Sequence, residues 1–130
     1  ASLVASWSKD PSTKVGCVLV DEDRHVIATG YNGFPRGVKD YDERYEDREV
    51  KYNFVQHAEA NAIIQAVAPT KESTAYVTHM PCSTCAGMLI QAGVSRVVAV
   101  KSEDLAKRFE HSFHCSNIMF DEAGVVVDLF

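Results

Sequence analysis

The sequence predicts an α/β fold, a three-layer α/β/α sandwich built on a mixed five-stranded sheet. Two short apolar runs near the start are separated by a polar turn, which is typical of a β-hairpin. Later in the chain, valine-rich runs alternate with segments of helical length, which indicates strands joined by helices on both faces of the sheet. The 130 residues fit a single domain, 1–130, because nothing in the composition suggests a second core.

The first half of the chain supplies the hairpin and a long charged segment. Val15–Val20 and Val26–Tyr31 are the expected strands, on either side of the turn Asp21–Arg24. From Gly33 to about Lys51, glycine, proline and mixed charges dominate, so we expect a surface segment that is partly helical. A solvated face is the simplest interpretation, and a lid or subunit contact is the alternative, because long loops in compact domains are often functional.

The second half alternates helices with strands. The alanine-rich, apolar stretch Ala58–Val67 predicts a buried helix that ends before Pro69. Pro81 starts a second helix, and Gly93 ends it. The other expected elements are strands at Ala75–Thr78, Val94–Val100 and Val125–Val127, and helices at Glu103–Glu110 and Asn117–Ala123.

Charge and hydropathy exclude several classes of function. The formal net charge of -5 gives no support for binding a nucleic acid polymer, so a small substrate is favoured. No apolar run approaches the roughly 20 residues that span a bilayer, and the first residues lack the pattern of a signal peptide. Cys17 lies in an apolar run, and Cys82 and Cys85 have metal-ligand spacing, which disfavours disulfides. We therefore expect a soluble, cytoplasmic protein with no membrane partner.

Two motifs carry the strongest chemical signal. His57-Ala58-Glu59 lies at the start of one expected helix, and Pro81-Cys82-Ser83-Thr84-Cys85 lies at the start of the next. A histidine and two thiolates close three positions of a tetrahedral zinc site and leave the fourth open for water, as in catalytic zinc sites. The pattern matches the signature of zinc deaminases that act on nucleobases. The predicted ligands of one zinc ion per chain are His57, Cys82 and Cys85.

Glu59 is the predicted catalytic residue. A carboxylate that stays off the metal can accept a proton from zinc-bound water and return it to the substrate. Two helix N-termini would also point at the metal and offset part of the charge that its thiolates donate. In isolation, the His-x-Glu pair would be an exposed surface pair and the Cys-x-x-Cys pair a redox dithiol, but their combination disfavours both interpretations.

Further motifs point to one family. Together with the zinc motif, three segments resemble deoxycytidylate (dCMP) deaminases of the cytidine deaminase superfamily: Ser8-Lys9-Asp10-Pro11, Gly30-Tyr31-Asn32-Gly33-Phe34-Pro35 and Ala123-Gly124-Val125. The resemblance covers nearly the whole chain and implies the cytidine deaminase-like fold. It implies hydrolysis of dCMP to dUMP and ammonia, which supplies dUMP for thymidylate synthesis, with a zinc-bound hydroxide attacking C4 while Glu59 moves the protons.

The resemblance also implies roles for binding residues. Asn32 would hold the deoxyribose, although asparagine before glycine is by itself a common turn residue. The Ala58 backbone N–H would bind the pyrimidine O2, and the backbone near Pro81 and Cys82 would face the leaving amino group. Members of this family are commonly homohexamers activated by dCTP and inhibited by dTTP, with Mg²⁺ as a companion of the nucleotide effector. The candidate effector site is Tyr31, Asn32 and Gly33.

Several residues stay open at this stage. A substrate phosphate needs a cation or a nest of N–H groups, and the candidates are Lys14, Arg36, Arg108 and His111. A second, structural metal at His111, His114 and Cys115 lacks an evident fourth ligand, so helix-flanking polar residues are the simpler interpretation. We expect His79 to be a strand-end residue and Trp7 to pack a short first helix.

Other functions remain as alternatives. A tRNA adenosine deaminase shares the zinc motif but is disfavoured by the acidic charge balance, and a deaminase of free cytidine commonly has cysteine where His57 stands. A deaminase of another cytosine nucleotide, such as dCTP or a 5-substituted dCMP, fits the same residues. From a different class, a non-catalytic nucleotide-binding regulator could keep the fold, but the intact zinc motif and Glu59 disfavour it.

Overall fold

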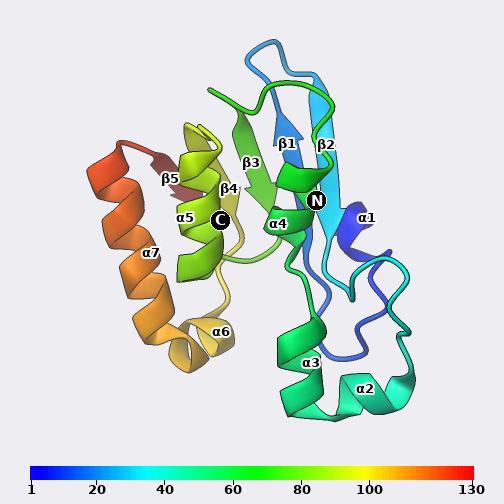
Figure 1. The fold of residues 1–130 in the computed structure, drawn as a ribbon. Helices are drawn as coiled ribbons and strands as arrows, with labels where there is room; N and C mark the ends of the chain where they lie inside the picture. Colours follow the sequence, from blue (N-terminus) through cyan, green and yellow to red (C-terminus); the bar gives the residue numbers. More distant parts are fainter.

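The computed structural model describes residues 1–130 and is built on a mixed sheet (Figure 1). The five strands have the order β2-β1-β3-β4-β5. β1 (Gly16–Val20) pairs antiparallel with both β2 (Val26–Tyr31) and β3 (Thr74–Val77). β3, β4 (Arg96–Ala99) and β5 (Val126–Leu129) are parallel to one another. The predicted hairpin and the predicted mixed five-stranded sheet are therefore confirmed.

One face of the sheet carries most of the helices. Right-handed crossovers between parallel strands place α5 (Ser83–Gln91), α6 (Glu103–Arg108) and α7 (Glu110–Ala123) on the same side of the sheet. α4 (Ala58–Ile64) joins them there and contacts β1, β2 and α5. The hydrophobic core lies between this layer and the sheet, and it includes Cys17, Leu19, Val97, Leu89 and Phe120, all almost fully buried. This layer also contains both halves of the zinc motif.

The opposite face carries only the short helix α1 (Ser2–Ala5). Two glycines lie on opposite faces of the sheet. Gly30 pairs with Cys17, the residue after Gly16, and successive residues of a strand face opposite sides. A side chain at Gly16 would collide with the backbone of α1, and one at Gly30 would collide with the backbone of α4. The three layers are thus present, and α1 rather than a helix of the second half forms the third.

The charged segment before His57 folds into α2 (Asp42–Glu46) and α3 (Arg48–Phe54). Its aromatic side chains pack together, with Phe34 stacked on the buried Tyr45 at 4.3 Å between ring centroids and set edge-on to Phe54 at 5.6 Å. An ion pair of 3.0 Å between Lys51 and Asp10 fastens α3 to the loop before β1. The predicted partly helical segment is therefore a packed wall of the molecule as well as a charged surface.

Two helices differ from the predicted bounds by three residues or more. α4 ends at Ile64 rather than Val67, because the N–H of Val67 donates to the carbonyl oxygen of Ile27 in β2 instead of continuing the helix. α7 begins at Glu110 instead of Asn117. Its first turns contain Ser112 and Ser116, polar residues typical of a loop, which here form hydrogen bonds with Ser83 at the start of α5 and with Pro81 just before it. No helix of the structure has the length and apolar character needed to cross a membrane.

Candidate metal centre

The predicted metal ligands come from the starts of two neighbouring helices. His57 is the N-cap residue of α4, Cys82 is the N-cap residue of α5, and Cys85 lies in the first turn of α5. Both N-cap residues have extended backbone conformations, and neither makes a side-chain hydrogen bond that caps its own helix. Their imidazole and thiol groups are therefore available to each other across the contact between α4 and α5.

The distances between the ligand atoms match a tetrahedral zinc site. His57 Nδ1 lies 3.5 Å from Cys82 Sγ and 3.3 Å from Cys85 Sγ. Zinc bonds of about 2.05 Å to nitrogen and about 2.3 Å to sulfur, at tetrahedral angles, place nitrogen and sulfur about 3.5 Å apart. The cluster contains these three side chains and no fourth ligand. The residues therefore fit one zinc ion with an open coordination position.

Hydrogen bonds among the three ligand side chains shift their pKa values. A hydrogen bond from Cys85, and a further one from His57, lower the pKa of Cys82 to about 4 despite its partial burial. The same hydrogen bond, together with burial, raises the pKa of Cys85, and the contact with Cys82 raises the pKa of His57. Zinc requires two thiolates and a neutral imidazole, so metal binding must displace protons from the cluster.

Glu59 lies beside the cluster and outside it. Its side chain belongs to the first turn of α4, it is 4% exposed, and it is absent from the group of converging ligand atoms. Burial raises the pKa of Glu59, while hydrogen bonds from its own backbone N–H and from Cys85 act in the opposite direction. A buried carboxyl group that lies beside the metal ligands without being one of them has the placement that proton transfer requires.

A cavity of about 440 Å³ lies in front of the cluster. Its inner wall contains His57, Ala58, Glu59 and Cys82. The other walls come from the loop before β1, from Asn32, and from α3 and α6, which lie on either side of the zinc motif (Figure 1). The volume falls within the range of about 300–1,000 Å³ that is usual for small-molecule sites.

The predicted substrate-binding positions lie around this cavity. Ala58 is the first residue of α4, where N–H groups have no intrahelical partner and His57 supplies no cap. Pro81 itself is buried, and its neighbours Met80 and Cys82 border the cavity. The Ser116 hydroxyl donates a hydrogen bond of 2.9 Å to the Pro81 carbonyl oxygen. The roles of Ala58 and Pro81 in contacting the base stay predictions.

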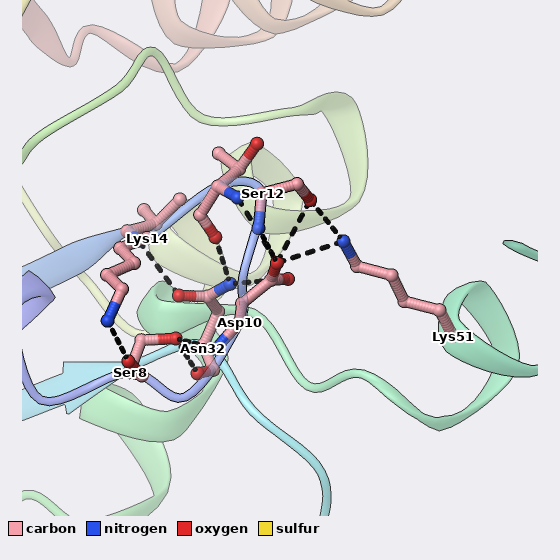
Figure 2. A network of polar contacts seen from close by, with 8 residues as sticks. Ser8, Asp10, Ser12, Lys14, Asn32 and Lys51 are labelled. Carbon is pink, nitrogen blue, oxygen red and sulfur yellow. Dashed lines mark hydrogen bonds and ion pairs between the residues drawn. The ribbon is translucent and has the colours of Figure 1, made fainter. Parts of the chain in front are cut away.

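Asn32 borders the cavity and is held by a dense polar network (Figure 2). Its Oδ1 accepts a hydrogen bond of 2.8 Å from the Val15 N–H, and its Nδ2 donates to the Thr13 carbonyl oxygen at 2.9 Å. The other predicted effector residues lie nearby: Tyr31 is 42% exposed, and Gly33 pairs with Gln56 just before the metal ligand His57. The assignment of an effector site to this segment stays a prediction.

The cations of the cavity differ from those the sequence indicated. Of the four phosphate candidates only Arg108 borders the cavity, and the Lys14 ammonium donates instead to the Ser8 carbonyl oxygen at 2.7 Å. Arg48 and Lys51 of α3 were missed, because only the folding of the charged segment brings them to the cavity. His79 also borders it.

Two further groups of residues lie in α7. Ser112 and Ser116, whose roles the sequence did not indicate, bond to the segment Pro81–Ser83 that contains Cys82. The Ser83 N–H donates to Ser112 Oγ at 2.9 Å, and the Ser116 hydroxyl donates to the Pro81 carbonyl oxygen. No sequence spacing connects α7 with that segment. His111 and Cys115 lie one turn apart with 3.8 Å between Nε2 and Sγ, and His114 does not complete a metal-ligand group with them.

Comparison with known proteins agrees with this geometry. The family model for the cytidine and deoxycytidylate deaminase zinc-binding region matches residues 1–101. A protein described as an uncharacterized deaminase in the luxG 3′ region of Aliivibrio fischeri is 43% identical over 128 residues, or 98% of this chain and 86% of that protein. A probable deoxycytidylate deaminase of Caenorhabditis elegans is 42% identical over 127 residues, covering 95% of this chain and only 62% of its own length.

A solved structure is similar over the whole chain. The crystal structure of dCMP deaminase from the cyanophage S-TIM5, in complex with dCMP and dUMP, superimposes with a TM-score of 0.78. The match covers 100% of this chain and 90% of the phage enzyme at 26% sequence identity.

Proposed function

Because the chain belongs to the cytidine and deoxycytidylate deaminase family, we propose that it is a zinc-dependent hydrolase that converts dCMP to dUMP and ammonia. One observation carries the proposal: His57, Cys82 and Cys85 converge with 3.3 Å and 3.5 Å between Nδ1 and the two Sγ atoms, and His57 and Cys82 border a cavity together with the buried carboxyl group of Glu59, which is not one of the converging ligands. The phage relative that superimposes on the chain was crystallised with the same substrate and product.

The residues of the cavity divide the work of the reaction. His57, Cys82 and Cys85 would hold the zinc ion, whose chemistry would be to activate water at neutral pH. Glu59 would carry the first proton of the attacking water to N3 of the base, and then the second, from the hydroxyl group added at C4, to the amino group, which leaves as ammonia. Burial favours this role, because it makes the carboxyl a better proton acceptor than an exposed glutamate. The pyrimidine O2 would bind the N–H groups at the start of α4, which lack intrahelical partners and a side-chain cap.

The charged walls of the cavity favour a nucleotide over a nucleoside. Arg48 and Arg108 border the cavity from α3 and α6, and neither takes part in an ion pair. Their guanidinium groups instead lie over the rings of Tyr52 and Phe109, at 5.9 Å and 5.4 Å from the centroids. Guanidinium groups without acidic partners suit a phosphate, which they bind in a bidentate manner.

A panel of substrates tests the proposal. The zinc-loaded protein should release ammonia faster from dCMP than from cytidine, CMP, dCTP or 5-methyl-dCMP. Arg108→Met should raise the KM for dCMP about 10-fold or more, because it removes a charge-assisted contact, and should leave turnover of cytidine unaffected. If cytidine and dCMP react equally well, the phosphate plays no part in recognition.

Regulation and assembly complete the proposal. Activation by dCTP and inhibition by dTTP at Tyr31, Asn32 and Gly33, with Mg²⁺ as companion of the effector, follow from the family resemblance. A homohexamer in the cytoplasm that supplies dUMP for thymidylate synthesis rests on the same resemblance. Initial rates with each effector, and the molar mass from analytical ultracentrifugation, test these points directly.

A further inference from the structure

The Ser8-Lys9-Asp10-Pro11 motif has no part in the zinc chemistry, yet two of its residues are buried against Asn32. The Ser8 hydroxyl donates to the Asn32 carbonyl oxygen at 2.8 Å, and the Asp10 N–H donates back to Ser8 Oγ at 3.2 Å. Figure 2 shows this loop wrapped around the Asn32 side chain, with the Lys51 side chain reaching in from α3. The motif therefore has a structural partner that borders the cavity.

Asp10 is the centre of this network. Its Oδ1 accepts from the Ser12 N–H at 2.9 Å, the Thr13 N–H at 3.1 Å and the Lys51 ammonium at 3.0 Å. Its Oδ2 lies 3.4 Å from Asn32 Nδ2. The Asp10 and Lys51 side chains are 3% and 15% exposed, so each charge depends on the other for its partner. A change in Lys51 therefore reaches Asn32 through one shared carboxylate.

The network fixes what Asn32 can offer to a ligand. Its two amide hydrogens point to the Thr13 carbonyl oxygen and to Asp10, and its Oδ1 accepts from the Val15 N–H. A backbone N–H on one side and a carbonyl oxygen on the other leave no choice in the orientation of the amide. One lone pair on Oδ1 remains, so Asn32 has acceptor capacity and no donor capacity left.

We propose that Asp10 and Lys51 are positioning residues that hold Asn32 as a hydrogen-bond acceptor for the 3′-hydroxyl of the substrate. The inference rests on the proposed function, since the deoxyribose of dCMP carries its 5′ oxygen as a phosphate ester and has the 3′-hydroxyl as its single free donor. Lys51 belongs to α3, so the charged segment before His57 takes part in recognition of the sugar.

The test compares dCMP with 2′,3′-dideoxy-CMP, which lacks only the hydroxyl in question. In the zinc-loaded wild-type protein, kcat/KM should favour dCMP by about 10-fold to 100-fold, the value of a polar contact whose loss leaves an acceptor unsatisfied. Lys51→Met and Asp10→Asn should reduce this preference to below about 3-fold, and Asn32→Ala should do the same. Lys51→Arg should restore most of it because arginine keeps the cationic donor.

Lys9→Met is the matched control. Lys9 lies in the same motif and also makes an ion pair, with Asp40 at 2.8 Å, but its side chain is 73% exposed and makes no hydrogen bond with Asp10, Asn32 or Lys51. This variant should keep the wild-type preference for dCMP. Circular dichroism and zinc content identify variants that fail to fold, and Lys51→Gln, which keeps a neutral donor, provides a milder perturbation.

The ratio of kcat/KM for dCMP to kcat/KM for 2′,3′-dideoxy-CMP distinguishes residues that position Asn32 from residues that only stabilise the fold. If Lys51→Met and Asp10→Asn slow both substrates equally and leave the ratio unchanged, the proposal is overturned. Calorimetric binding of the two nucleotides to the zinc-loaded protein gives the same ratio without turnover. If the zinc-loaded protein binds dCMP more tightly than 2′,3′-dideoxy-CMP but turns over neither, the proposed deamination is contradicted and the positioning roles remain. If it binds both nucleotides equally, the positioning roles are overturned.

Discussion

Replacement of Glu59 by glutamine removes a proton carrier and keeps the size of the side chain. We expect kcat for dCMP to fall by about 10³-fold to 10⁴-fold, the upper part of the usual contribution of general acid–base catalysis. This corresponds to about 4–5.5 kcal/mol in the activation barrier. The upper part applies because Glu59 is 4% exposed, so bulk water is a poor replacement. In the proposed mechanism the same carboxyl group also serves both the attacking water and the leaving amine.

The neighbours of Glu59 offer no equivalent proton carrier. Asp10 borders the same cavity, but its carboxylate is bound to Lys51, which keeps it ionised. Burial lowers the pKa of His79, which also borders the cavity, so its imidazole is a weaker proton acceptor than an exposed histidine. Rescue of the variant by either group should therefore be small.

The assay follows dUMP formation and zinc content in the same preparation. Glu110→Gln is the matched control, because Glu110 occupies the first turn of α7 as Glu59 occupies the first turn of α4, yet it is exposed. The control should retain full activity, and Glu59→Gln should retain one zinc ion per chain. Loss of zinc from Glu59→Gln would place the carboxylate in the ligand shell, and activity within 10-fold of wild type would refute its role as proton carrier.

Three further substitutions, and a fourth that serves as a control, test the residues that support the site. Ser116→Ala leaves the buried Pro81 carbonyl oxygen without its donor, so the free energy of unfolding in urea should fall by about 1–3 kcal/mol and zinc should dissociate faster. Gly30→Ala forces β2 and α4 apart and should cost about 1–3 kcal/mol or more, whereas Gly87→Ala in open space should stabilise by about 0.5–1 kcal/mol in the same unfolding experiment. Burial would raise the pKa of Asp10, but hydrogen bonds led by the Ser12 N–H and Lys51 outweigh it and lower the pKa. The stabilisation is therefore complete above the ordinary pKa near 4 and is lost as pH falls through the lower folded value, so Asp10→Asn should flatten the acid limb of stability against pH.

The zinc centre was predictable because local sequence determines most of it. His57 and the pair Cys82 and Cys85 each lie at a helix start, and the spacing of the cysteines places both thiols on one side of the first turn of α5. Only the contact between α4 and α5 had to be assumed. The alternation of strands and helices likewise indicated the parallel half of the sheet.

The walls of the cavity could not be predicted in the same way. Arg48 and Lys51 reach it because aromatic packing and the ion pair with Asp10 fold the charged segment back onto the loop before β1. Ser116 was expected in a loop, but it lies in a helix and supports the site by a hydrogen bond to Pro81, which is 35 positions away in the sequence. Such contacts depend on tertiary packing, which residue periodicity does not encode.

The most direct test of the account is the dependence of dCMP hydrolysis on one zinc ion. Protein stripped of metal and titrated with Zn²⁺ should gain activity in proportion to zinc until one ion per chain is bound, and it should release dUMP and ammonia in equal amounts. His57→Ala should abolish both tight zinc binding and turnover. A fully zinc-loaded protein that leaves dCMP and every other cytosine nucleotide unchanged would contradict the account.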